Sequence, residues 1–180
     1  MAPWFPGLLA ALTALPWLAG APLIAAAAVP VSCPAPVTAQ ITGLYRWQVA
    51  RQNGRGPIDL SSQRSRFTPG LYDQLSKAYR LGPADGGFVD FDLFSGTQAA
   101  TFGATVVGCV PGEQGGLKAL VDVQVGLLNR ARDLPVRLGY QMRPGPSGEW
   151  TVVDIRYPGD PGFRLSSFLA CLCLFHRSTT

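Results

Sequence analysis

Residues 117–143, LKALVDVQVGLLNRARDLPVRLGYQMR, contain two runs in which apolar and polar side chains alternate, separated by the polar segment 129–133. One face of the first run carries Val121, Val123, Val125 and Leu127. The matching face of the second run carries Leu134, Val136, Leu138, Tyr140 and Met142. A period of two is typical of strands with one buried face, and a short polar connection joins antiparallel neighbours. This stretch therefore predicts the centre of an antiparallel sheet with an apolar side and a polar side.

The flanking sequence predicts two further strands and several helices. Strands are expected at about 100–110, 117–128, 133–143 and 149–157, the last with Val153, Ile155 and Tyr157 on its apolar face. Apolar residues at helical spacing predict helices at about 36–53, 60–65, 69–81 and 163–176. Segregation of helices and strands along the chain predicts an α+β fold, in which the sheet packs on the N-terminal helices and a C-terminal helix closes the domain.

The N-terminal region differs sharply in composition from the rest of the chain. All 15 Lys and Arg residues and all 11 Asp and Glu residues lie at or after Arg46, and an apolar stretch ends in Ala25–Ala28. This pattern predicts a secretory signal peptide at 1–28, a linker at 29–37, a single domain at 38–176 and a tail at 177–180. The protein is therefore expected to be secreted or periplasmic. Because the leader lacks a basic residue, an uncleaved membrane anchor is the alternative, and membrane contact is expected only through that segment.

Four cysteines, Cys33, Cys109, Cys171 and Cys173, would meet an oxidising environment after export. One disulfide is expected, with Cys109 paired to one of the two C-terminal cysteines, although four cysteines permit three full pairings and the sequence does not select one. Cys171 and Cys173 are two residues apart on a predicted helix, so their side chains diverge and should not pair.

The composition argues against several classes of function. The net charge is +4, but the basic residues are scattered and form no block that would follow a phosphate backbone, so no nucleic-acid partner is expected. His176 is the only histidine, which leaves little room for a nucleophile paired with a histidine base. Cys171, Cys173 and His176 do not have the spacing of a zinc site. No cofactor, metal or catalytic residue is predicted.

The aspartates are the remaining catalytic candidates, because a buried aspartate could act as a general base. In FVDFDLFSGTQ, residues 88–98, Asp90 and Asp92 suggest a calcium loop, but Phe94 occupies the next ligand position. The preferred interpretation is an extended segment anchored by Phe88, Phe91 and Phe94, whose acids cap turns or meet arginine. For Asp122 and Asp154, on the polar face near Arg137, cross-strand ion pairs are preferred over catalysis.

Four segments together resemble bacterial secreted proteins of domain-of-unknown-function family 3828, a family that looks like part of the nuclear transport factor 2-like superfamily. They are YRW at 45–47, LYDQLSKAY at 71–79, FDLFSGTQ at 91–98 and GEWTVVDIRY at 148–157. The resemblance covers about residues 40–165. It implies a cone-like α+β domain in which a strongly curved sheet wraps around helices and leaves a pocket. That superfamily contains both enzymes and binding proteins, so the fold implies a cavity without fixing a reaction.

The candidate ligand-binding residues are those expected near that pocket. The first helix buries a stripe of Val37, Ile41, Leu44, Tyr45 and Val49, with Gln48 inside the stripe and Trp47 on its flank. The full candidate set is Tyr45, Trp47, Gln48, Tyr72, Tyr79, Asp90 and Tyr140.

We expect non-catalytic binding of a small ligand or an envelope protein through a helix–sheet pocket. The alternative is a small isomerase or lyase that uses a pocket aspartate. A third option is a homodimer formed through the polar sheet face, which includes Asp122, Gln124, Arg137 and Arg156.

Overall fold

The computed structural model describes residues 29–54, 58–82, 88–159 and 161–177, with the side chains of the last helix described as far as Leu172. The predicted signal peptide at 1–28 therefore lies outside the described residues. The helices of the described chain are α1 (Ala35–Arg51), the 3₁₀ helices η1 (Ser61–Arg66) and η3 (Glu113–Gly115), α2 (Pro69–Ala78) and α3 (Leu165–Arg177). The strands are β1 (Ala100–Pro111), β2 (Leu117–Leu127), β3 (Arg130–Ala131), β4 (Val136–Pro144) and β5 (Trp150–Arg156).

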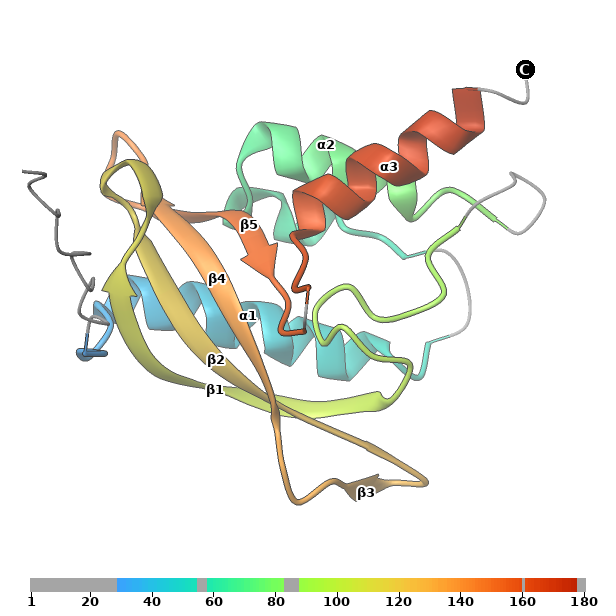
Figure 1. Ribbon diagram of the computed structural model, residues 1–180, viewed down its shortest axis with the longest axis horizontal. Coiled ribbons are helices and arrows are strands. Elements are labelled where there is room, and N and C mark those ends of the chain that lie inside the picture. The colour runs from blue at the N-terminus through green and yellow to red at the C-terminus, as the bar shows by residue number, and fades with distance from the viewer. Residues whose placement is uncertain (1–28, 55–57, 83–87, 160, 178–180) are drawn as a thin grey trace, which may run out of the picture.

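The strands form one antiparallel sheet in the order β1-β2-β4-β5, with the short β3 paired to β2. Figure 1 shows β1 and β2 curving past α1, while α2 and α3 lie together beside β5. The α+β architecture predicted from the sequence is thus confirmed. Register shifts in the β1–β2 pair, at Thr101/Gly103 and at Val106/Gly108, add local twist to these long strands.

The hydrophobic core lies between α1 and the inner face of the sheet. From α1 it takes Val37, Ile41, Leu44 and Tyr45, all at most 2% exposed, whereas Val49 is only partly buried. From the sheet it takes Ala119, Val121, Val123, Val125, Leu138, Tyr140, Met142, Val152 and Ile155. Alternating burial along β2 and β4 follows the pattern predicted from the sequence, because each strand presents one face to the helix.

Two details of the predicted inner face are wrong. A register shift between Gln141 and Met142 pairs Met142 with Val152, so Val152 rather than Val153 is buried with Ile155. Leu127 and Leu134 are 67% and 80% exposed, because the hairpin that joins β2 to β4 extends past the helices (Figure 1). The alternation of apolar and polar residues in the sequence reveals neither a β-bulge nor the point at which the helices stop covering the sheet.

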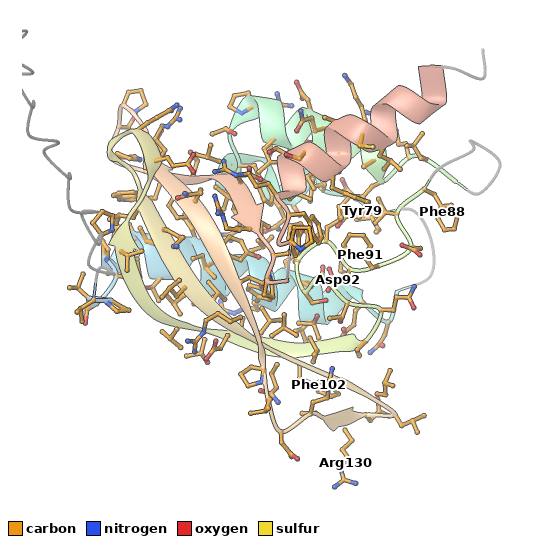
Figure 2. The ribbon with its side chains drawn as sticks, in the orientation of Figure 1. Tyr79, Phe88, Phe91, Asp92, Phe102 and Arg130 are labelled. Atoms are coloured by element: carbon orange, nitrogen blue, oxygen red, sulfur yellow. A yellow bond between two sulfur atoms is a disulfide. The ribbon has the colours of Figure 1, made fainter. Side chains whose placement is uncertain are left out.

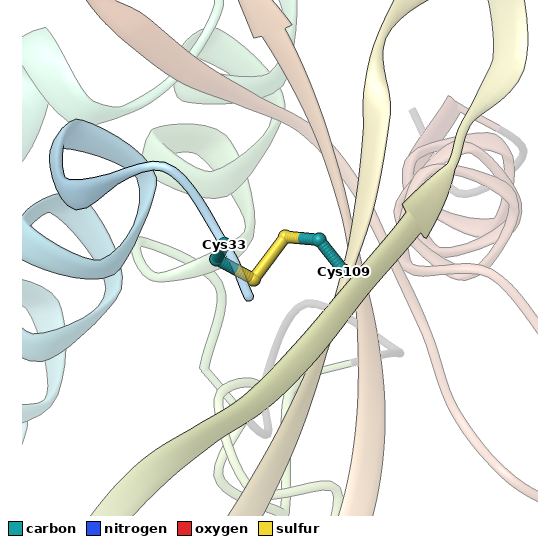
Figure 3. Close-up of a disulfide and its surroundings, with 2 residues drawn as sticks. All are labelled: Cys33 and Cys109. Atoms are coloured by element: carbon teal, nitrogen blue, oxygen red, sulfur yellow. A yellow bond between two sulfur atoms is a disulfide. The ribbon is translucent and has the colours of Figure 1, made fainter. Parts of the chain in front are cut away.

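The segment before α1 is fastened to the edge of the sheet. Val31 and Cys109 exchange two backbone hydrogen bonds of 2.9 and 2.7 Å, and Cys33 forms a disulfide with Cys109 (Figure 3). The expected pairing of Cys109 with a C-terminal cysteine is therefore wrong. Cys171 is free and exposed, and the side chain of Cys173 lies outside the described residues.

None of the helices in the described parts of the chain is both long enough and apolar enough to cross a bilayer.

The disulfide should contribute strongly to stability because it closes a loop with a sequence separation of 76 residues. Replacing both Cys33 and Cys109 with Ser is expected to lower the free energy of unfolding by about 2–4 kcal/mol, since the unfolded chain gains the entropy of an open loop. Urea unfolding with and without a reducing agent measures the effect. The doubly substituted protein should not respond to the reductant, and an equally stable reduced wild-type protein would contradict the prediction.

A strained backbone conformation occurs at the tip of the β2–β4 hairpin. Leu127 pairs with Arg130, and the two residues between them, Leu128 and Asn129, have φ values of 53° and 58°. Positive φ is costly for leucine and easily adopted by asparagine. Leu128 is 99% exposed, so its side chain gives no packing energy in return.

Leu128→Asn is accordingly expected to raise the free energy of unfolding by about 0.5–1 kcal/mol, through relief of that backbone strain. Denaturant unfolding provides the measurement. Leu127→Asn is the matched control, because Leu127 is also exposed but has no positive φ, and it should give no gain. A loss of stability in Leu128→Asn would show that the leucine is not strained.

Candidate functional site

A cavity of about 440 Å³ lies where the C-terminal ends of α1 and α2 meet the segment that leads into β1. We call it the α1–α2 pocket. Its apolar walls include Ile58, Leu81, Val89 and Phe91, and its polar lining includes Gln48, Arg51, Gln52, Tyr79, Asp92 and Gln98. Figure 2 shows Tyr79, Phe91 and Asp92 close to one another, and Phe88 farther out. The helices supply most of the polar groups, and the loop supplies an aromatic ring and a carboxylate.

The loop that carries Asp92 is held by its own hydrogen bonds. Asp92 Oδ1 accepts from the Phe94 N–H at 2.9 Å, and Asp92 Oδ2 accepts from the Thr101 hydroxyl at 2.9 Å. The Asp92 carbonyl accepts from the N–H groups of Ser95 and Gly96. Gly96 has φ of 70°, and a Cβ atom there would lie 2.8 Å from the Tyr157 ring, so the turn requires glycine. The prediction that this segment uses an acid to cap a turn is confirmed for Asp92.

Buried tyrosines also hold this loop, through hydrogen bonds to its backbone carbonyl groups. The Tyr45 hydroxyl donates to the Phe94 carbonyl at 2.6 Å, and the Tyr157 hydroxyl donates to the Leu93 carbonyl. The Tyr140 hydroxyl lies 2.9 Å from that of Tyr45 and donates to it, because the Tyr45 proton is already used. Leu93 and Phe94 are fully buried, whereas Phe88 is 43% exposed and does not anchor the segment as expected.

The helix side of the pocket is joined to the sheet by Gln52. Its Nε2 donates to the Thr101 carbonyl and its Oε1 accepts from the Thr101 N–H, both at 2.8 Å. Since the Thr101 hydroxyl also binds Asp92, one residue at the start of β1 links the end of α1 to the loop. The walls of the pocket are therefore connected by direct hydrogen bonds.

Three buried polar atoms of lining residues have no hydrogen-bond partner among the described residues: Gln48 Oε1, Arg51 Nε and the Tyr79 hydroxyl oxygen. A fourth such atom, Ser76 Oγ, does not belong to the lining. The Gln48 residue is only 3% exposed. Buried polar atoms in folded proteins are nearly always hydrogen-bonded, so three exceptions in residues that line one cavity set this region apart.

Electrostatics at the pocket are governed by burial and by two opposite charges. Burial raises the pKa of Tyr79 above that of a free phenol, the Arg51 charge opposes this shift, and Asp92 reinforces it. The Tyr79 hydroxyl is thus protonated at neutral pH and able to donate a hydrogen bond. Burial also raises the pKa values of Tyr45, Tyr140 and Tyr157, and Asp92 adds to each shift.

The residues predicted from the sequence are divided between the pocket and its surroundings. Gln48 and Tyr79 line the pocket. Tyr45 and Tyr140 are fully buried beneath the loop, and Trp47 packs against Phe94 and under the Arg51 guanidinium. Tyr72 lies under the Arg64 guanidinium, and Asp90 is exposed, where it accepts a hydrogen bond of 3.4 Å from Gln98. Sequence reasoning missed Arg51 and Gln52, although both follow Gln48 at helical spacing.

The remaining acidic candidates lie outside the α1–α2 pocket and have structural partners. Arg137 Nε and Nη2 donate to the two oxygens of Asp122 at 2.7 Å, which holds the pKa of that carboxyl below its usual value. This confirms the predicted cross-strand ion pair for Asp122. The same prediction is wrong for Asp154, which is only 6% exposed and is hydrogen-bonded to α3 instead of pairing with an arginine of a neighbouring strand. Asp154 is buried, accepts hydrogen bonds from the N–H and hydroxyl of Ser166, and so caps the start of α3. Within the described ranges, no group of three or more His, Cys, Asp or Glu residues could hold a metal ion.

Comparisons of the chain with protein-family models, with curated proteins and with solved structures gave no match.

The buried tyrosines predict a loss of stability at alkaline pH. The folded protein keeps the protons of Tyr45, Tyr79, Tyr140 and Tyr157 at a pH where the unfolded chain has released them, since the pKa of an unfolded tyrosine is about 10. The contribution of these tyrosines to the free energy of unfolding is therefore constant below about pH 10. Above it, the free energy of unfolding should fall by about 1.4 kcal/mol per pH unit for each tyrosine.

Urea unfolding at a series of pH values between about 9 and 11 tests this expectation. Tyr140→Phe should make the decline less steep by the share of one tyrosine, because the variant has one phenol fewer to titrate. A free energy of unfolding that does not change across this range would contradict the burial of these hydroxyl groups.

Proposed function

We propose that this protein binds a small organic molecule in the α1–α2 pocket without transforming it. The observation that carries the proposal is that Gln48, Arg51 and Tyr79, each with a buried polar atom that has no partner among the described residues, line one cavity. The volume of about 440 Å³ falls within the range of small-molecule sites. Apolar and polar residues contribute equally to the lining of this cavity, so a molecule with both an apolar and a polar part would fit.

The state of Asp92 favours binding over acid–base catalysis. It supplies the carboxylate of the α1–α2 pocket, but both oxygens accept hydrogen bonds that hold the loop. These hydrogen bonds fix the Asp92 side chain as a structural group of the loop. Asp90, Asp122 and Asp154, the other aspartates considered for an isomerase or lyase, are not among the lining residues.

Two further proposals concern the location of the protein and its macromolecular partners. The Cys33–Cys109 disulfide supports export to an oxidising compartment, in agreement with the predicted signal peptide. Contact with an envelope protein, the second candidate function, is favoured by three leucines of the β2–β4 hairpin, Leu127, Leu128 and Leu134, which are 67%, 99% and 80% exposed. Homodimer formation through the polar sheet face remains a prediction, and the Asp122–Arg137 pair on that face is already satisfied within one chain.

Native mass spectrometry of the protein purified from its own envelope fraction tests these proposals together. We expect a complex with one small molecule and a protein mass that lacks the leader. A Gln48→Leu variant, which loses one buried polar group of the α1–α2 pocket but keeps the helix, should lose the small molecule. A wild-type protein that never retains a small molecule, but co-purifies with a protein dependent on Leu128, would favour the second candidate. A retained molecule that is unaffected by Gln48→Leu would place the site elsewhere.

A further inference from the structure

We infer that the ligand of the α1–α2 pocket is an organic monocarboxylate whose carboxylate group binds Arg51. The inference rests on the proposed function, since it assigns a chemical class to the molecule bound there. It begins with the position of Arg51, the last residue of α1 and part of the lining.

The Arg51 guanidinium is held in place by aromatic rings and leaves its donors unused. Its central carbon lies 4.6 Å from the centroid of the Trp47 ring and 5.8 Å from that of Tyr79. These contacts orient a flat cation without using its N–H groups. Arg51 makes no hydrogen bond or ion pair with a side chain in the described ranges, and its buried Nε has no partner.

Comparison with the other arginines shows that this state is unusual for a partly buried position. Arg66 and Arg164 are the other partly buried arginines of the described chain. Arg66 donates to the Gln63 side chain and to two oxygens of Gln40, and Arg164 forms an ion pair with Glu113. Among these three, Arg51 is the one that lines the α1–α2 pocket and has no hydrogen bond or ion pair with a protein acceptor in the described ranges.

The negative charge of the α1–α2 pocket does not neutralise Arg51. Asp92 accepts hydrogen bonds from Phe94 and Thr101 and forms no ion pair within the described chain. Both oxygens of Asp92 thus accept hydrogen bonds from the protein, whereas Arg51 has none with an acceptor of the described chain, and this difference favours an anionic ligand over a cation. A guanidinium matches a carboxylate through two parallel hydrogen bonds.

The number of charges distinguishes a carboxylate from a phosphate. A phosphate monoester carries nearly two negative charges at neutral pH and would face the Asp92 carboxylate with a single arginine to balance it. A monocarboxylate needs only one cation. The Tyr79 hydroxyl provides a second donor beside Arg51, and Leu81, Val89 and Phe91 offer apolar surface for the rest of the molecule.

Ligand-observed NMR with compounds matched in shape but different in charge tests the inference. The probes are benzoate, benzamide and benzylamine; hexanoate, hexanamide and hexylamine; indole-3-acetate, indole-3-acetamide and tryptamine; and phenyl phosphate. In each set the carboxylate should bind about tenfold more tightly than the amide, the factor expected for one charge-assisted hydrogen bond, and the amine should bind more weakly still. Phenyl phosphate should bind more weakly than benzoate.

Substitutions at Arg51 provide the second part of the test. Arg51→Gln should remove the preference for carboxylates while amide binding stays unchanged, and Arg51→Lys should keep part of the preference because the charge remains. Arg46→Gln is the matched control, since Arg46 is exposed on the same helix and lies outside the lining. It should behave as the wild-type protein does. Unfolding curves of all variants establish that the fold is intact.

The possible results distinguish an error in the class of ligand from the absence of a binding site. Amides or amines that bind as tightly as carboxylates, or a carboxylate preference that survives Arg51→Gln, would overturn the inference and leave the proposed binding function standing. Tighter binding of phenyl phosphate than of benzoate would assign the α1–α2 pocket to phosphate instead. If no probe binds the wild-type protein at millimolar concentration, both the inference and the proposed function fail.

Discussion

Two buried hydroxyl groups determine the shape of the end of the molecule that contains the α1–α2 pocket. Tyr45 and Tyr157 donate hydrogen bonds to the carbonyl oxygens of Phe94 and Leu93, which belong to a loop with no partner strand. A buried carbonyl without a partner would cost about 1–3 kcal/mol, so these contacts are needed for the loop to enter the core. Because Leu93 and Phe94 are anchored, the preceding residues Phe91 and Asp92 are held in the lining of the α1–α2 pocket.

The same constraint explains why a cavity persists there. Gln52 fixes the end of α1 to Thr101, and Thr101 in turn donates to Asp92, so helix, strand and loop are connected through one residue. The side chains of Gln48, Arg51 and Tyr79 lie within this frame, where no described protein group meets their free polar atoms. Pre-formed walls lower the conformational cost of binding, because little must be ordered when a ligand enters. This is the physical basis for proposing a binding site.

The sequence predicted the layers of this fold well and its exceptions poorly. Alternation along residues 117–143 placed β2 and β4 correctly, because a strand with one covered face leaves a period of two in its composition. The exposure of Leu127 and Leu134 depends on where the helices end, which is a property of the assembled fold. The Cys33–Cys109 bridge depends on the path of residues 29–34 along β1, which local spacing does not contain.

The pocket was only partly predictable for a related reason. Gln48 was recognisable as a polar residue inside an apolar stripe, and Tyr79 as an amphipathic aromatic residue near a helix end. In the sequence, Arg51 resembles an ordinary cation in the last turn of a helix, where the helix dipole stabilises a positive charge. Only the placement of Trp47 and Tyr79 around its guanidinium, and the lack of a described acceptor nearby, distinguish it from a surface arginine.

The central claim is that the loop at 91–97 is a fixed wall of the pocket, and amide hydrogen exchange of the ligand-free protein measures this most directly. The account predicts that the N–H groups of Phe94, Ser95 and Gly96, which donate to Asp92, exchange as slowly as those in the middle of β2, because opening the loop would expose Leu93 and Phe94. Exchange of these three amides at the rate of an unprotected chain would contradict it, since the pocket would then have no fixed wall.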